Sequence, residues 1–176
     1  MNAASASREE GEPATEGFAP IARSDARILV LGSLPGVASV NAMQYYAHPQ
    51  NAFWKIMREL WDIDGDYDDR CAQLVARRIA VWDVLASSVR PGSMDADIRP
   101  STARPNDFRT FFEDHPGIRR ICFNGKTAER LFRRLVAREL STPLPELASL
   151  PSTSPAYASM PFHRKLEIWR SMLLVS

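Results

Sequence analysis

Residues 32–54 hold the side chains whose types and spacing best suit the binding of a planar ligand. The segment begins Gly-Ser-Leu-Pro-Gly, and the glycines at 32 and 36 let the backbone approach a ligand closely. Tyr45, Tyr46 and His48 follow in a stretch that has neither helical nor strand periodicity. Tyrosines outside a regular element either stack on a planar ligand or pin a structured loop. The residues by themselves favour the pinned loop, with stacking as the functional alternative.

The elements that must position this segment alternate between strands and helices. Short apolar runs predict strands at 27–32, 79–83, 118–123 and 148–150. Apolar spacing and capping signals predict helices at 52–60, 68–78, 107–114, 127–139 and 162–174, with Asn106 as the N-cap of the third. The alternation predicts an α/β fold, a three-layer αβα sandwich with a central, mainly parallel four-stranded sheet.

The carboxyl ends of the strands are the expected location of a ligand site in such a sheet. Four loops are therefore candidates, those that follow Leu31, Val84, Phe123 and Leu150. Each of them is rich in Gly, Pro, Ser or Asn. We expect the functional residues to lie in these loops.

The composition is that of one soluble globular domain, with 176 residues of which 45% are hydrophobic and 24% charged. Residues 1–24 are polar and low in bulky apolar side chains, which predicts a disordered leader before a single domain at 25–176. No apolar stretch approaches the roughly 20 residues that cross a bilayer, and the N-terminus lacks the layout of a secretory signal. We expect a cytoplasmic monomer that has no membrane partner.

The cysteines and histidines give no signal for a metal or a cofactor. Cys71 and Cys122 are too few for a four-cysteine site, and buried free thiols are the simplest interpretation. The three histidines share no short metal-ligand spacing. We therefore predict neither a metal nor a cofactor.

The net charge of +1 gives no overall attraction to nucleic acid, but the charges are unevenly placed. Acidic residues crowd positions 62–69, and arginines crowd positions 119–138. Each run is either a solvated face or a binding face. Lys126 and Arg130 open the basic helix, where they would approach a phosphate or face solvent.

Motifs spread over residues 27–169 resemble those of the uracil-DNA glycosylase superfamily. The first motif is long and specific, with Gly-Ser-Leu-Pro-Gly at 32–36 and Tyr-Ala-His-Pro-Gln-Asn-Ala-Phe-Trp at 46–54. Shorter matches are Val-Trp-Asp-Val-Leu-Ala at 81–86, Gly-Ser-Met-Asp at 92–95, Phe-Asn-Gly-Lys at 123–126 and Leu-Pro-Ser-Thr-Ser-Pro-Ala at 150–156. Ser-Leu within the loop and Gln-Tyr-Tyr-Ala-His-Pro at 44–49 resemble the hypoxanthine-DNA (deoxyinosine) glycosylases, which are related to the mismatch-specific uracil enzymes.

The resemblance implies an enzyme that extrudes a deaminated base from DNA, above all hypoxanthine, and hydrolyses its N-glycosidic bond. In the mismatch-specific enzymes an Asn within the Gly-rich loop positions the attacking water, and here Leu34 can neither donate nor accept a hydrogen bond. The resemblance transfers the catalytic role to Asn51, for which a helix N-cap is the structural alternative. Tyr46 would stack on the base, and a half-buried loop tyrosine is its alternative.

The substrate contacts implied by the resemblance come from the first motif and from one later strand end. They are Gly32, Ser33, Leu34, Pro35, Gly36, Gln44, Tyr46, His48 and Asn124. The Gln44 amide supplies a donor and an acceptor for a base edge, whereas His48 has a structural alternative. Asp83 and Asp95 are acids near strand ends, with salt bridging or capping as their default role.

Contacts to the DNA backbone are expected from the basic helix and from the Ser-Thr-Ser loop. The residues are Lys126, Ser152, Thr153 and Ser154, whose hydroxyls and free backbone N–H groups suit phosphate, with a plain turn as the alternative. Related enzymes place an apolar wedge near this loop, and Tyr157 and Met160 are the options here.

Three other functions remain open. A uracil-excising enzyme of the same fold is disfavoured by Leu34 without being excluded. A non-catalytic module that binds damaged DNA would bind without releasing a base. A small-molecule hydrolase would use the same pocket at the sheet edge.

Overall fold

The main sheet has four parallel strands in the order β3-β2-β6-β7. The computed structural model describes residues 11–140 and 143–174. The strands are β2 (Ile28–Gly32), β3 (Ile79–Asp83), β6 (Arg120–Asn124) and β7 (Glu146–Leu150). Every neighbouring pair is parallel, so all four carboxyl ends lie at one edge of the sheet. The predicted α/β sandwich with a four-stranded parallel sheet is confirmed.

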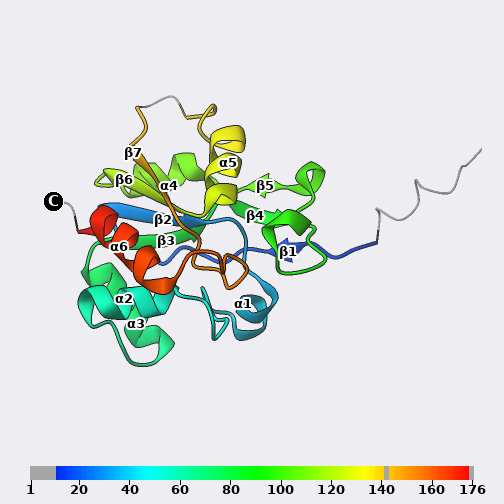
Figure 1. Ribbon diagram of the computed structural model, residues 1–176. Coiled ribbons are helices and arrows are strands. Elements are labelled where there is room, and N and C mark those ends of the chain that lie inside the picture. The colour runs from blue at the N-terminus through cyan, green and yellow to red at the C-terminus, as the bar shows by residue number, and fades with distance from the viewer. Residues whose placement is uncertain (1–10, 141–142, 175–176) are drawn as a thin grey trace, which may run out of the picture.

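Helices cover both faces of the sheet, as Figure 1 shows. Helices α4 (Phe108–Asp114) and α5 (Lys126–Leu135) lie on one face, and α2 (Phe53–Trp61), α3 (Tyr67–Ala76) and α6 (Phe162–Leu173) lie on the other. After β2 the chain forms β3 at one edge of the sheet. It then crosses back past β2 and forms β6 on the other side of that strand. Such crossover connections are right-handed. The connection from β2 to β3 therefore places its helices on one face, and the connections that run in the opposite direction, from β3 to β6 and from β6 to β7, place theirs on the other.

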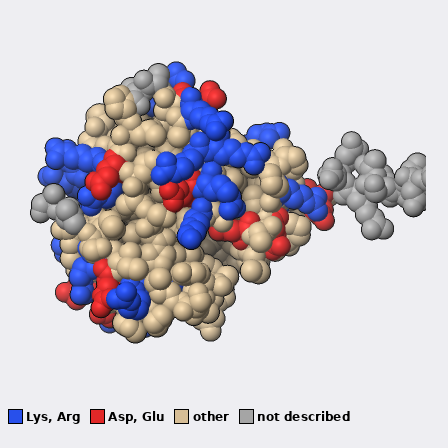
Figure 2. All heavy atoms as spheres, turned by 45° about the horizontal axis from the view of Figure 1, so that its top comes forward, with Lys and Arg blue, Asp and Glu red and all other residues tan. Residues whose placement is uncertain are grey.

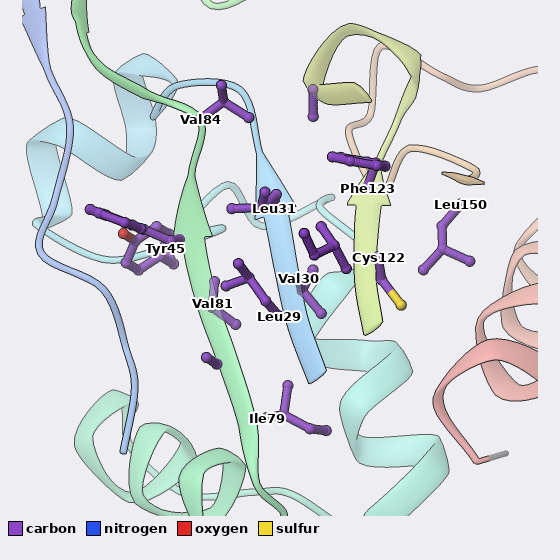
Figure 3. Packing of buried hydrophobic residues seen from close by; sticks show 14 of the residues in the cluster. Leu29, Val30, Leu31, Tyr45, Ile79, Val81, Val84, Cys122, Phe123 and Leu150 are labelled. Carbon is purple, nitrogen blue, oxygen red and sulfur yellow. The ribbon is translucent and has the colours of Figure 1, made fainter. Parts of the chain in front are cut away.

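The strands form because their residues are apolar enough to be buried from both sides. All five residues of β3, Ile-Ala-Val-Trp-Asp, are buried, as are four of the five in β2 and in β6. Figure 3 shows Leu29, Leu31, Val81 and Phe123 packed among the strands and helices of this core. Burial on both faces is the reason for continuous apolar runs in a parallel sheet.

The N-terminal segment corrects one prediction, because residues 11–24 are not a disordered leader. Strand β1 (Thr15–Glu16) pairs antiparallel with β4 (Leu85–Ser88), which also pairs with β5 (Arg104–Pro105). Ile21 forms a bridge with Val81 of β3. Backbone pairing thus holds a segment that has few bulky side chains of its own. Residues 1–10 lie outside the described residues.

Other elements differ from the prediction in detail. A short helix, α1 (Val37–Ala42), and two single-turn 3₁₀ helices (Asp95–Asp97 and Pro100–Thr102) lie in stretches that we expected to be loops. The cap of α4 is Asp107, whose carboxylate accepts a hydrogen bond from the Thr110 amide at 3.1 Å. Asn106 instead donates to the Asp83 carbonyl at 2.8 Å, which secures the end of β3.

Across the described residues, no helix combines the length and the apolar character that a bilayer crossing would need.

Candidate active site

A cavity of about 630 Å³ opens at the carboxyl edge of the sheet. Its walls come from residues 32–39 at the end of β2, from Asp83 at the end of β3 and part of 90–96 after β4, from 124–127 at the end of β6 and from 149–157 at the end of β7. The chain turns in opposite directions after β2 and β6, which is the switch point where ligands bind in open α/β sheets. All four predicted loops therefore meet at one site.

The adjacent tyrosines of the first motif have separate roles. Tyr45 is buried in the core, and its hydroxyl donates to the Ala19 carbonyl at 2.9 Å. Tyr46 has a left-handed backbone with φ of 57°, and its ring centroid lies 6.2 Å from that of Tyr45. The Tyr46 ring stacks on Phe53 with centroids 4.2 Å apart, and Tyr46 lines the cavity. Tyr45 therefore pins the loop, and stacking of Tyr46 on a ligand stays a prediction.

Asn51 lies at the entry to α2 and lines the same cavity as Tyr46. Its Oδ1 accepts a hydrogen bond from the Phe53 amide at 2.9 Å in the turn before α2, whose N-cap position is Ala52. The Asn51 backbone N–H donates to the His48 carbonyl at 2.9 Å. The bond to Phe53 fixes the side chain in the cavity wall and leaves the second lone pair of Oδ1 and the amide N–H groups for a ligand.

Asn124 ties the end of β6 to the Ser-Thr-Ser loop. Its Nδ2 donates to the Thr153 hydroxyl at 2.8 Å, and its Oδ1 accepts from the Thr153 amide at 2.9 Å. The Thr153 carbonyl accepts from the Ala52 amide at 3.0 Å, which joins this loop to the first motif. Thr153 is 1% exposed, so its hydroxyl faces Asn124 and not the surface where DNA phosphate was expected. Ser152 and Ser154 are half-buried.

A buried arginine holds the glycine-rich loop from behind. Arg90 donates to the carbonyls of Leu34 and Pro35, and its side chain is 2% exposed. Its guanidinium lies 3.8 Å from the Asp95 carboxylate, which also accepts a hydrogen bond from the Ser33 hydroxyl at 2.5 Å. Sequence reasoning missed Arg90, because nothing in its neighbourhood distinguishes a buried arginine from the many on the surface.

Asp83 ends β3 directly beside Gly32 and is 4% exposed. A side chain at position 32 would collide with the Asp83 carboxylate and lie 3.2 Å from the Tyr46 hydroxyl, so glycine is required for this approach. Burial raises the pKa of Asp83 to about 7, although Arg90 lowers it and Asp95 raises it further. Burial likewise raises the pKa of Tyr46. Asp83 Oδ2 and the Tyr46 hydroxyl are buried without a hydrogen-bond partner among the described residues.

The surface beside the cavity is basic on the α5 side. Figure 2 shows Lys and Arg side chains gathered over this helix, and Lys126, Arg130, Arg133 and Arg134 are exposed. Gly125 precedes α5 with φ of 96°, a conformation that favours glycine. Lys126 lies at the cavity wall, and its contact with DNA phosphate stays a prediction.

Tyr157 is an exposed aromatic residue at the cavity wall, 38% accessible to solvent. The buried Lys165 donates from Nζ to the Tyr157 carbonyl at 2.6 Å, and the same Nζ lies 5.0 Å from the ring centroid. Burial lowers the pKa of Lys165. A lysine on α6 thus supports this part of the loop from below.

Of the predicted substrate contacts, the structure gathers all but one around the cavity. Residues 32–36, Tyr46, His48 and Asn124 line it, whereas Gln44 does not. His48 is exposed, and its Nδ1 accepts from the Gln50 amide at 3.1 Å. Within residues 11–140 and 143–174, no three His, Cys, Asp or Glu side chains lie close enough together to hold a metal ion.

Comparison with known proteins places this arrangement in a family. The model of the family described as "Uracil DNA glycosylase superfamily" matches residues 19–173. A hypoxanthine DNA glycosylase of Methanosarcina barkeri is 34% identical over 114 residues, which cover 63% of this chain and 71% of that protein. A hypoxanthine DNA glycosylase of Methanosarcina acetivorans is 37% identical over 117 residues, which cover 64% and 72% respectively.

A solution NMR structure from Methanosarcina acetivorans, named provisionally as a uracil DNA glycosylase, has a similar fold. It superposes with a TM-score of 0.73 at 32% identity and covers 92% of this chain and 97% of its own. The family resemblance inferred from the motifs is confirmed. The chain therefore belongs to the uracil DNA glycosylase superfamily and is a DNA glycosylase, an enzyme whose substrate is DNA that carries a damaged base.

Proposed function

We propose that this glycosylase extrudes hypoxanthine from deoxyinosine in DNA and hydrolyses its N-glycosidic bond. The observation that carries the proposal is the shared cavity of Tyr46 and Asn51, both from the first motif. A volume of about 630 Å³ lies within the range of about 300–1,000 Å³ that is typical of small-molecule pockets. The names of the two Methanosarcina relatives support the choice of base.

Tyr46 and Asn51 divide the work between binding the base and directing water. One face of the Tyr46 ring packs on Phe53, which leaves the opposite face to stack on the purine. Asn51, fixed by its bond to the Phe53 amide, orients a water molecule toward the sugar C1′. Because Leu34 has no polar group in the loop, Asn51 supplies the amide that the mismatch-specific enzymes carry there.

The surface around the cavity provides the contacts to the DNA strand. Lys126 and the hydroxyls of Ser152 and Ser154 meet phosphate, while Thr153 shapes the loop through Asn124. Tyr157 fills the space that the extruded base leaves in the stack, since it is exposed and supported by Lys165. The enzyme works as a monomer in the cytoplasm.

The test is excision from a duplex that carries one deoxyinosine, measured as alkali-induced strand breakage in the presence of a chelator. Asn51→Ala should lower the single-turnover rate by about 100-fold or more, because misplaced reactants cost about that much. Asn41→Ala, on the exposed face of α1, is the matched control. Excision by Asn51→Ala at the parent rate, with folding intact, would remove Asn51 from the mechanism.

Two further substrates separate this proposal from its alternatives. A duplex with uracil tests the uracil-excising enzyme, which would cleave it faster than the inosine duplex. Tight binding of inosine DNA with no abasic product would identify a non-catalytic binding module. Release of hypoxanthine as the preferred product supports the proposal.

A further inference from the structure

Most polar side chains around the cavity already have protein partners. Ser33, Asn51 and Asn124 each bond to another protein group. Three buried side-chain atoms have no partner among the described residues: Asp83 Oδ2, the Tyr46 hydroxyl and Arg90 Nε. A buried polar group without a partner costs about 1–3 kcal/mol, so such a group in a native site calls for a physical reason.

Two of these groups, the Asp83 carboxyl and the Tyr46 hydroxyl, lie close to Gly32. Asp83 Oδ1, the other oxygen of that carboxyl, and the Tyr46 hydroxyl both approach the point where Gly32 would carry a Cβ atom, and both residues line the cavity. Asp83 cannot move away easily, since its backbone lies in β3 opposite Gly32 and its carbonyl accepts from Asn106. A carboxyl group is therefore held in the wall of the base pocket, withdrawn from bulk water.

The charges that face Asp83 favour its neutral form. Arg90 is the cation of this cluster, and three carboxyl groups, Asp83, Asp95 and Asp97, share its charge. Asp95 is bound by Ser33 and lies 3.8 Å from the guanidinium, so it takes the greater share of that positive charge. The Tyr46 hydroxyl adds no positive charge. With a pKa of about 7, Asp83 is about half protonated at neutral pH and becomes fully protonated as the pH falls below it.

We propose that Asp83 is a further catalytic residue, whose neutral carboxyl group donates its O–H to the carbonyl oxygen of the extruded base. The inference rests on the proposed function, and it names the part of the base that the pocket recognises. A neutral carboxyl offers one donor and one acceptor, which complement the C=O and N–H of the lactam edge that deamination creates. The bond to the carbonyl strengthens as negative charge builds up on the departing base.

The proton count of the reaction is unchanged by this role. The C1′–N bond breaks, and its electron pair leaves with the base. The water oxygen bonds to C1′ and releases its proton to solvent, while the base takes up a proton from solvent. Asp83 keeps its own proton throughout. Once ionised, it would place a fixed negative charge beside the developing one and slow the reaction.

The direction of the pH dependence tests this role. We expect the single-turnover rate of the full chain on inosine DNA to fall above about pH 7, by roughly tenfold per pH unit if the ionised form is inactive. Asp83→Asn keeps an N–H donor and cannot ionise, so this decline should disappear. Asp68→Asn, exposed on α3, should retain the parent profile. A rate that rises through pH 7, or an unchanged decline in Asp83→Asn, overturns the proposal.

Two more measurements keep the test decisive. Asp95→Asn should move the decline in the single-turnover rate to lower pH, because Asp95 raises the pKa of Asp83. This variant tests the role of Asp83 even if Asp83→Asn does not fold. NMR titration of the Asp83 carboxyl carbon should show that free hypoxanthine raises its pKa, since the base binds the neutral form. That measurement needs no catalysis. If Asp83 titrates as expected but the protein does not excise hypoxanthine from inosine DNA, the proposed function is refuted and the binding of the base by Asp83 is not. No change with hypoxanthine would refute the role of Asp83.

Discussion

Tyr46 shows how one residue can combine a strained backbone with a functional side chain. Its φ of 57° is uncommon for a residue with a bulky side chain and costs about 1–3 kcal/mol. The neighbouring Tyr45 compensates, because its hydroxyl bonds to Ala19 and its carbonyl accepts from the Trp54 indole at 2.9 Å. The anchored residue holds its neighbour in a conformation that presents an aromatic ring to the cavity.

Replacement of Tyr46 separates the ring from its hydroxyl. We expect Tyr46→Ala to reduce kcat/KM on inosine DNA by about 10- to 100-fold, since base stacking on an aromatic ring is worth about 1–3 kcal/mol. Tyr46→Phe keeps the ring and removes a buried hydroxyl without a partner, so its Tm should equal or exceed that of the parent. Steady-state kinetics and thermal unfolding measure both. Equal activity of the Ala and Phe variants would contradict stacking.

At the scale of elements, backbone hydrogen bonds join the loops of the site to one another and to neighbouring strand ends. The Val84 amide donates to the Gly32 carbonyl at 2.9 Å, and the Ala52 amide donates to the Thr153 carbonyl at 3.0 Å. The Gly125 amide donates to the Leu150 carbonyl at 3.0 Å. These bonds join the loops after all four strands, so the rigid sheet fixes the shape of the cavity through its edge.

The loop after β7 provides a prediction about DNA structure. Tyr157→Ala should slow excision from a duplex more than excision from a single strand, because only the duplex needs a residue to replace the extruded base. Lys165→Met should have the same selective effect in weaker form, since it removes the donor to the Tyr157 carbonyl. Rates on matched single- and double-stranded substrates measure the ratio. An equal loss on both would assign Tyr157 to general binding.

For the whole molecule, a buried acid links catalysis to stability. The Asp83 carboxyl has a pKa of about 7 when folded and an ordinary value of 3.8 when unfolded. Between these values the folded state binds more protons, so stability falls as pH rises, by up to about 1.4 kcal/mol per pH unit. Carboxyl groups whose pKa is lowered in the folded state, such as Asp107 and Glu129, have the opposite effect on stability. Their contribution to the free energy of unfolding is lost as the pH falls.

We therefore expect the free energy of unfolding to decline between about pH 4 and pH 7 and to level off above it. Asp83→Asn should reduce that slope, whatever its effect on stability at a single pH. Urea unfolding at a series of pH values measures the slope. A slope that is the same in both proteins would show that Asp83 ionises normally in the folded state.

The sequence by itself determined the four strands of the main parallel sheet and the family of this protein. Strands buried on both faces must be continuously apolar, and the runs at 27–32 and 79–83 meet that requirement whatever surrounds them. The edge where the loops meet follows from parallel strands alone, so Tyr46, Asn51 and Asn124 could be placed at one site in advance. Local signals were enough for these features.

Only the tertiary structure decided which groups remain free to act. The Asn124 and Thr153 side chains are polar and were expected to contact ligand or DNA, but they bond to each other across 29 positions of sequence. Gln44 lies outside the cavity, and residues 11–24 are ordered by pairing with β4 and β3. Asp83 acquires its raised pKa from burial beside Gly32. Burial and pairing depend on residues distant in the chain, and no local pattern encodes them.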